Sequence, residues 1–180
     1  MDLIEKALQV ASQAHDGQYR KQTKTPYITH PVAVGMILMK AGLPEELVAA
    51  GILHDTVEDT TLTLEEIKHW FGLKIGEIVA GCSEPDKSLV WEERKRHSIE
   101  YLKTASEDIR IVACADKLHN LHSIRHDFNQ VGEEVWLRFS RGKDKQEWYY
   151  RQIVESLGHQ SEFLLLNDLR AEVNEIFGSV

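Results

Sequence analysis

The chain has 180 residues, of which 42% are hydrophobic, and its formal net charge is −8 at pH 7. This size and apolar content predict one compact domain with a sizeable core, and the absence of an apolar run of about 18 residues argues against a membrane span. The negative charge argues against a general affinity for nucleic acid or anionic membranes, but it is compatible with a small anionic ligand where cations gather locally.

Helical periodicity begins at the amino terminus, where apolar residues fall on one face of a helix that ends near His15. These residues are Leu3, Ala7, Val10, Ala11 and Ala14. The stretch lacks the basic start and apolar centre of a secretory signal. A polar loop is expected over residues 17–29. Pro31 then fits the first turn of a helix that runs to about Lys40 and is closed by Gly42.

Pro44 opens the next predicted helix, which continues into residues 52–61. Its apolar positions are Leu47, Val48 and Ile52. Thr63 followed by Glu66 forms a capping-box pattern, which predicts the start of a short helix that ends at Gly72. An apolar segment, "IGEIVAGC", then leads into the loop "SEPDKSLV".

Four helices are predicted in the second half of the chain, and Ser106 is expected to cap the second of them. They span about 91–104, 107–126, 144–157 and 161–177. No stretch alternates as a strand would, so the sequence predicts an all-α, single-domain helical bundle over residues 1–180. The two cysteines, Cys82 and Cys114, lie in apolar surroundings and are expected to be reduced, as in a cytoplasmic protein.

The stretch "ILHDTVEDTT" places His54, Asp55, Glu58 and Asp59 close together. If it is helical, the two later acids lie one turn beyond the His-Asp pair. A solvated acidic helix end is the simplest interpretation. However, the preceding "VAAGILHD" is apolar on nearly every side, so the pair emerges from a buried helix. A buried carboxylate must be paired or bind a metal, because burying a bare charge is very costly.

Two more candidate ligands lie far from this stretch. His30 precedes Pro31 at the start of a helix, and Asp116 lies in an apolar run. Each has a simpler explanation, because His30 alone could be a structural histidine and Asp116 could form a local ion pair with Lys117 or His119. The spacing permits these residues to converge with the His-Asp pair but does not require it.

Three segments carry a resemblance to a known family: "AHDGQYRKQTKTPYITHP" (14–31), "AGILHDTVEDTTLTLEEIKHWFG" (50–72) and "DIRIVACADKLHNLHSIR" (108–125). Their order and spacing resemble the HD phosphohydrolase superfamily. The closer resemblance is to the hydrolase domain of RelA/SpoT-type alarmone enzymes and to the stand-alone small alarmone hydrolases. The implied fold is the all-α HD domain.

The resemblance also implies roles for single residues. Four of them would be ligands of one divalent metal ion, usually manganese in this family: His30, His54, Asp55 and Asp116. Two imidazoles and two carboxylates suit such a cation. Glu58 and Asp59 match the acidic pair that positions or activates the attacking water. Asn120, Arg20 and Lys21 match residues that contact the nucleotide.

The implied reaction removes pyrophosphate from the ribose 3′ position of guanosine tetra- or pentaphosphate and leaves GDP or GTP. A water on the metal would be the nucleophile, attacking phosphorus in line. The implied partner is therefore a small nucleotide, with neither nucleic acid nor membrane involved. A homodimer is left open.

The chain departs from the family pattern at two places. Thr25 replaces a glutamate before Pro26, and "AGCSEPDKSLVWEERKRH" replaces a Gly-Val-Thr-Lys stretch. Candidate contacts to the pyrophosphate are basic residues of the replaced segment and of "SRGKDKQEWYY", of which Lys87 and Lys143 are taken as substrate-binding residues. The other basic residues are Arg94, Lys95, Arg96, Arg141 and Lys145. The competing interpretation is a solvated charged surface.

Three other functions stay open. The same metal site could hydrolyse another nucleotide, such as a deoxynucleotide or a 3′-phosphorylated adenosine compound. The chain could instead be a sensor that binds an alarmone without hydrolysing it, although the acids Glu58 and Asp59 argue for catalysis. A di-iron oxygenase is the least favoured of the three, because it needs further histidine ligands and the positions of His69, His97, His119 and His122 do not indicate a second metal site. The aromatic residues of the second half are expected in the core.

Overall fold

The computed structural model describes residues 1–21, 23–84, 86 and 88–179. Helices account for nearly all of the regular structure in these residues. They are α1 Leu3–Ala14, α2 Thr29–Lys40, α3 Glu45–Leu53, α4 Thr56–Asp59, α5 Leu64–Phe71, α6 Leu73–Cys82, α7 Trp91–Thr104, α8 Glu107–Val131, the 3-10 helix η1 Gly132–Arg138, α9 Gly142–Leu157 and α10 Leu164–Phe177. Over the described ranges the only β-pairing is an isolated bridge between Tyr19 and Pro26, which confirms the all-α prediction.

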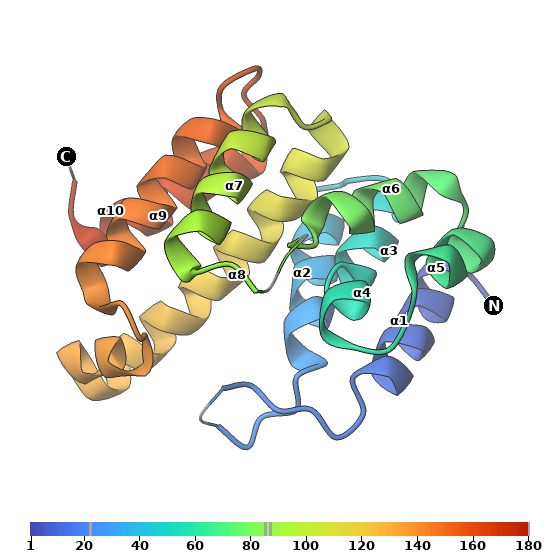
Figure 1. Cartoon of the computed structure of the whole chain (residues 1–180), viewed down its shortest axis with the longest axis horizontal. Coiled ribbons are helices and arrows are strands. Elements are labelled where there is room, and N and C mark those ends of the chain that lie inside the picture. The colour runs from blue at the N-terminus through green and yellow to red at the C-terminus, as the bar shows by residue number, and fades with distance from the viewer. Residues whose placement is uncertain (22, 85, 87, 180) are drawn as a thin grey trace.

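The long helix α8 runs through the middle of the molecule (Figure 1). On one side it packs against α2, α3 and α6, and on the other against η1, α9 and α10. Its central part is buried all round, which explains the continuous apolar run from Ile111 to Ala115. Segments from both halves of the chain therefore meet along α8.

Several helix starts follow the local signals in the sequence. Thr63 and Glu66 form the complete capping box that the sequence predicts. The side chain of Ser106 accepts a hydrogen bond from the Ile109 amide and caps α8. The predicted bounds of α7 are also confirmed. Within the described part of the chain, every helix is too short or too polar to cross a bilayer.

The prediction of one continuous helix from Pro44 into residues 52–61 is wrong. The structure has two elements here, because α3 ends at Leu53 and α4 is a separate turn. At this break, side chains form hydrogen bonds with backbone carbonyl groups. Thr56 Oγ1 donates to the Leu53 carbonyl at 2.7 Å, and the His54 ring bonds the Gly51 carbonyl at 2.7 Å. Such bonds compete with the helical ladder. The Asp59 amide still donates to the Asp55 carbonyl at 2.9 Å, so the acids of α4 follow the His-Asp pair by about one turn.

Close packing of α2 on α3 depends on two glycines. A Cβ on Gly35 would lie 2.5 Å from Ile52 Cγ1, and one on Gly51 would overlap the Leu38 side chain. Both positions need glycine because buried side chains fill the space beside them. This contact brings the start of α2, which carries His30, beside the end of α3, which precedes His54.

The predicted core aromatics are confirmed where they are buried. Trp136, Tyr149 and Tyr150 are 6%, 4% and 5% exposed. The rings of Trp91 and Trp148 pack with their centroids 6.2 Å apart and are partly buried. These aromatic side chains contribute to the packing of η1, α7 and α9 in the second half of the molecule.

Candidate active site

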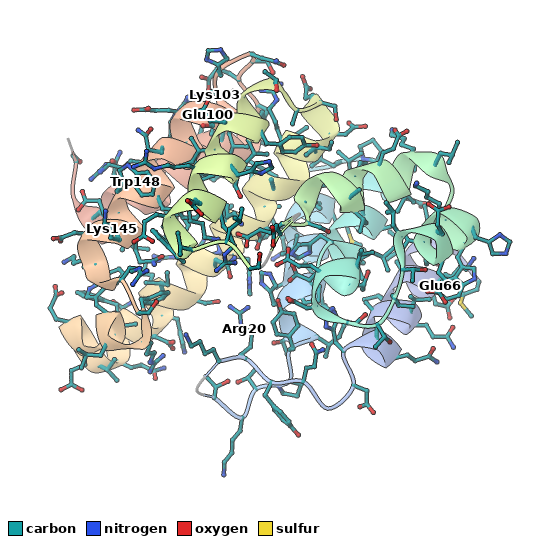
Figure 2. All side chains as sticks on the ribbon, in the orientation of Figure 1. Arg20, Glu66, Glu100, Lys103, Lys145 and Trp148 are labelled. Atoms are coloured by element: carbon teal, nitrogen blue, oxygen red, sulfur yellow. The ribbon has the colours of Figure 1, made fainter. Side chains whose placement is uncertain are left out.

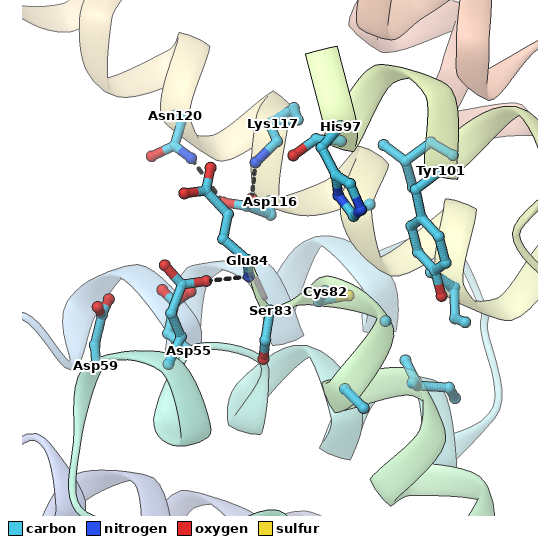
Figure 3. A pocket seen from close by; sticks show the side chains of 18 of the residues that line it. Asp55, Asp59, Cys82, Ser83, Glu84, His97, Tyr101, Asp116, Lys117 and Asn120 are labelled. Carbon is cyan, nitrogen blue, oxygen red and sulfur yellow. Dashed lines mark hydrogen bonds and ion pairs between the residues drawn. The ribbon is translucent and has the colours of Figure 1, made fainter. Parts of the chain in front are cut away.

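The described residues line a cavity of about 940 Å³ between the two halves of the molecule (Figure 3). Asp55 and Asp59 face it from the α3–α4 region, and Asp116 faces it from α8. His30 lines the same cavity from α2, while His54 is buried directly behind it at 2% exposure. The structure therefore brings His30 and Asp116 together although they lie 86 positions apart in the sequence.

The orientation of the His54 ring is fixed by the backbone. Its Nδ1 lies 2.7 Å from the Gly51 carbonyl oxygen and donates to it. Its Nε2 lies 3.1 Å from Asp55 Oδ1 and 3.7 Å from Asp116 Oδ1, and it is a buried atom with no hydrogen bond among the described residues. A buried imidazole nitrogen aimed at two carboxylates is the arrangement of a metal ligand.

His30 is oriented by a second histidine. Its Nδ1 lies 2.7 Å from Nδ1 of His119, and its Nε2 lies 3.1 Å from Asp116 Oδ1. Burial, with a further contribution from His30, lowers the pKa of His119 to about 4, so its ring is neutral and can accept the proton of His30. That hydrogen bond leaves the Nε2 lone pair of His30 directed at the carboxylates.

Asp55 reaches both imidazoles. Its Oδ1 lies 3.1 Å from His54 Nε2 and its Oδ2 lies 3.5 Å from His30 Nε2. The Tyr27 hydroxyl donates to the same Oδ2 at 2.6 Å. Burial opposes the charge of this carboxylate, but the His54 ring outweighs burial and holds the pKa of Asp55 below its ordinary value.

Asp116 is held from its other side. Lys117 Nζ donates to Oδ2 at 2.6 Å, and Asn120 Nδ2 donates to Oδ1 at 2.6 Å. The local ion pair considered from the sequence is thus present with Lys117, whereas His119 bonds His30 instead. Burial is again outweighed, here by Lys117 and the histidines, and the pKa of Asp116 lies well below its ordinary value.

These four side chains fit a divalent cation. Ligand atoms of His30, His54 and Asp116 all lie within 4.8 Å of one another, the one such group found in the described part of the chain. The charges around these ligand atoms favour a cation. Burial opposes a positive charge on His54, yet Asp55 and Asp116 raise the pKa of its ring well above the ordinary value. Two ionised carboxylates and two correctly oriented imidazoles are a donor set for a borderline divalent ion.

The two acids of α4 lie beside this group. Glu58 lines the cavity, and its Oε2 accepts the backbone amide of Glu84 at 2.8 Å. Asp59 is more exposed, and its Oδ2 lies 3.3 Å from the Tyr27 hydroxyl oxygen, whose single hydrogen is shared with the shorter bond to Asp55. Tyr27 therefore joins the carboxylates of Asp55 and Asp59, and burial followed by the charge of Asp55 raises the pKa of its phenol.

Arg20 and Asn120 both line the cavity and approach each other there. Arg20 extends from the loop before α2 towards α8 (Figure 2), and its Nη2 lies 3.4 Å from Asn120 Oδ1. Its guanidinium carbon lies 5.8 Å from the centroid of the Tyr27 ring. A neighbouring cavity of about 710 Å³ shares Arg20, Tyr27 and Asn120 and is also lined by Lys21, which is exposed.

The predicted phosphate contacts divide into three groups. Lys87 lies outside the described residues. Lys143 is not brought to the cavity: its Nζ lies 3.0 Å from Glu133 Oε1 and 5.6 Å from the centroid of the Trp136 ring.

The other basic candidates differ in their positions. Arg141 pairs with Glu92 at 3.0 Å, and Lys145 lies over Trp148 (Figure 2). Arg94 and Lys95 do line the cavity.

Three residues of the site were not identified as functional from the sequence. Tyr27 lies three positions before His30 within "TPYITHP", and His119 lies three positions after Asp116 on the same helix. That helical spacing could have placed His119 on the ligand-bearing side of α8. Glu84 carries no comparable signal, because it lies in a loop and its contacts come from other elements.

Comparison with known proteins adds to this geometry. A model of the HD domain family matches residues 7–144. The guanosine-3′,5′-bis(diphosphate) 3′-pyrophosphohydrolase MESH1 of Danio rerio is 39% identical over 150 residues, which cover 82% of this chain and 79% of that protein. A GTP pyrophosphokinase of Streptomyces coelicolor is 33% identical over 176 residues, or 96% of this chain, but the chain spans only 19% of its length.

A solved structure gives the same picture of the fold. It is described as a metazoan ortholog of SpoT that hydrolyzes ppGpp and plays a role in starvation responses. It superposes with a TM-score of 0.82 at 27% identity and covers 99% of this chain and 98% of its own. The similarity thus extends over α9 and α10, beyond the part that the family model matches.

Proposed function

We propose a function for this chain from the premise that it belongs to the HD domain family, whose model matches residues 7–144. It is a metal-dependent hydrolase that removes pyrophosphate from the ribose 3′ position of guanosine 3′,5′-bis(diphosphate), or of the pentaphosphate, and leaves GDP or GTP. The observation that carries this proposal is the meeting of His30, His54, Asp55 and Asp116 at the wall of one cavity, which the acids of α4 also line. Similarity to the zebrafish pyrophosphohydrolase supports the choice of substrate.

The divalent metal site has a proposed occupant and proposed ligands. His30, His54, Asp55 and Asp116 would hold the ion, and Mn²⁺ suits their mixture of imidazole and carboxylate donors. When bound, such a cation polarises a phosphoryl oxygen and makes a water molecule more acidic.

The chain's own residues would perform the remaining steps. Glu58 faces the cavity, so its carboxylate can orient a water and take its proton as the oxygen attacks phosphorus. Asp59 supports it through the shared contact of Tyr27 with Asp55 and Asp59. The bond that breaks joins the attacked phosphorus to the ribose 3′ oxygen, which must gain a proton as it leaves. Arg20 and Asn120, at the cavity mouth, would contact the nucleoside.

Two broader features belong to the same proposal. Residues 1–180 would form one domain, because α9 and α10 pack on each other and on α8. A cytoplasmic location is supported by the two free cysteines, Cys82 and Cys114.

A nucleotide panel tests the substrate. With Mn²⁺ added, guanosine tetraphosphate should give the largest kcat/KM, ahead of deoxynucleotides and 3′-phosphorylated adenosine compounds. The reason is that the family resemblance and the relative named as a guanosine-3′,5′-bis(diphosphate) 3′-pyrophosphohydrolase agree on this ligand. A higher kcat/KM for another nucleotide would reassign the substrate, and binding without product after prolonged incubation would indicate a sensor.

The contact between His119 and His30 predicts a loss of metal affinity. His119→Phe removes the acceptor 2.7 Å from His30 Nδ1 and frees the ring of His30 to change tautomer. We expect Mn²⁺ to bind about 10- to 100-fold more weakly, the usual effect of losing a hydrogen bond to a ligating histidine. Calorimetric titration with Mn²⁺ measures the change directly.

His122→Phe is the matched control, since His122 lies on the same helix and its Nε2 faces Glu172 Oε2 of α10 at 3.7 Å. Its Mn²⁺ affinity should stay within about twofold of the wild type. An equal loss in both variants would show that His119 acts through the packing of α8 and not through His30.

A further inference from the structure

The cations that line the cavity are already engaged with protein groups. Lys117 donates to Asp116, and Lys74 lies 3.3 Å from Asp108 Oδ2. Arg94 and Lys95 both donate to Glu84, the latter at 2.6 Å. A polyanionic substrate that binds at Lys74, Arg94, Lys95 or Lys117 therefore competes with the carboxylate that each of these cations already contacts.

Glu84 is the carboxylate best placed to be displaced. Asp116 is one of the proposed metal ligands, and Asp108 neutralises a single cation. Glu84 instead accepts from two cations through its two separate oxygens. A terminal phosphoryl or diphosphate group presents several oxygens and at least two negative charges, so it can satisfy both Arg94 and Lys95 in the same way.

Burial makes this triad stronger than a surface ion pair. The side chains of Glu84, Arg94 and Lys95 are 14%, 25% and 18% exposed. Interactions between partly buried charges are screened less by water and salt than those between exposed charges. Burial opposes the charge of Glu84, yet Lys95 and Arg94 hold the pKa of its carboxyl below the ordinary value, so it is ionised at neutral pH.

The same residue contacts the proposed water-activating acid. The backbone amide of Glu84 donates to Glu58 Oε2 at 2.8 Å. The anion-binding end of the cavity and the catalytic acid are therefore linked by one residue. A phosphoryl group bound at Arg94 and Lys95 would lie within the same cavity as Glu58 and the metal ligands.

We infer that Glu84 is a specificity-determining residue that occupies the anion site of Arg94 and Lys95 until the diphosphate group of the substrate displaces it. This inference rests on the proposed function for the identity of the diphosphate. Because a ligand must replace an ion pair with two cations, groups carrying at least two negative charges are selected over neutral or singly charged ones. The competition with Glu84 also limits how tightly the pyrophosphate product is retained.

Binding of inorganic pyrophosphate to the full chain tests the inference. Titration calorimetry is run with a chelator in place of divalent metal on the wild type and on Glu84→Gln, which keeps the shape of the side chain and removes its charge. We expect the Kd of pyrophosphate to fall about tenfold in Glu84→Gln, because charged hydrogen bonds no longer have to be broken. Glu84→Ala also frees both cations, so its Kd for pyrophosphate should fall as well. This variant provides the test if Glu84→Gln is poorly folded.

Glu77→Gln is the matched control. Glu77 is an exposed acid that lines the same cavity, so its substitution changes the net charge equally. Its pyrophosphate Kd should change by less than about twofold, since water and salt screen the charge of an exposed side chain. Unchanged affinity in Glu84→Gln and Glu84→Ala, or equal tightening in Glu77→Gln, would overturn the inference. This assay contains neither metal nor nucleotide, so its result is separate from whether guanosine tetraphosphate is the substrate.

Discussion

Asp55→Asn is expected to lower kcat/KM for guanosine tetraphosphate by at least about a thousandfold. Asp55 is the one proposed ligand whose two oxygens face both imidazoles, at 3.1 Å from His54 Nε2 and 3.5 Å from His30 Nε2. An amide removes the negative charge and offers one oxygen in place of two. Metal assistance contributes several kcal/mol to such reactions, and each factor of ten corresponds to about 1.4 kcal/mol.

The measurement pairs steady-state kinetics with a Mn²⁺ titration, because the variant should lose both activity and metal affinity. Asp108→Asn is a suitable control: Asp108 lines the same cavity but pairs with Lys74 at 3.3 Å, away from the histidines. It should retain kcat/KM within about twofold, as expected for an exposed ion pair. Wild-type metal affinity in Asp55→Asn would remove Asp55 from the ligand set.

Glu58→Gln is expected to separate catalysis from metal binding. We expect kcat to fall by about 10²- to 10⁴-fold, the usual contribution of a general base, while the Kd of Mn²⁺ stays unchanged. The reason is that Glu58 lies in the cavity but outside the group of His30, His54 and Asp116. The glutamine can still accept the Glu84 amide through its carbonyl oxygen, so the loop contact is preserved.

The outcome that contradicts this role is full activity in both Glu58→Gln and Asp59→Asn. Loss of metal affinity together with activity would instead make Glu58 a ligand. Comparing the two variants also assigns the proton acceptor, since the acid that activates water should show the larger loss in kcat.

Local signals in the sequence predicted much of the fold because they act over a few residues. The capping box at Thr63 and Glu66 and the cap at Ser106 both form, and the predicted α7 is confirmed. The break after Leu53 could not be predicted in this way. It depends on side-chain bonds of His54 and Thr56 to backbone carbonyls, which compete with a helix that the apolar pattern favours.

The end of α8 was also misjudged, since the helix continues to Val131 instead of stopping near residue 126. Gly132 directly follows α8 and has a φ of 62° and a ψ of −144°, a backbone conformation that favours glycine. Packing of α8 against η1 and α10 provides the tertiary support for this extra length.

The metal-ligand candidates could be named from the sequence through the family resemblance, whereas their orientation could not. His30 depends on His119, and Asp55 depends on Tyr27, across contacts between residues 89 and 28 positions apart. Basic residues were the least predictable group. Two lysines in charged segments look alike in sequence, but Lys143 pairs with Glu133 whereas Lys95 lines the cavity.

The central claim is that this chain uses a water molecule to cleave the bond between phosphorus and the ribose 3′ oxygen of guanosine tetraphosphate. The most direct measurement is mass spectrometry of both products after reaction with Mn²⁺ in ¹⁸O-labelled water. We expect GDP and pyrophosphate in equal amounts, one ¹⁸O atom in the pyrophosphate and none in the GDP. Label in the ribose of GDP, or the absence of pyrophosphate, would contradict the account.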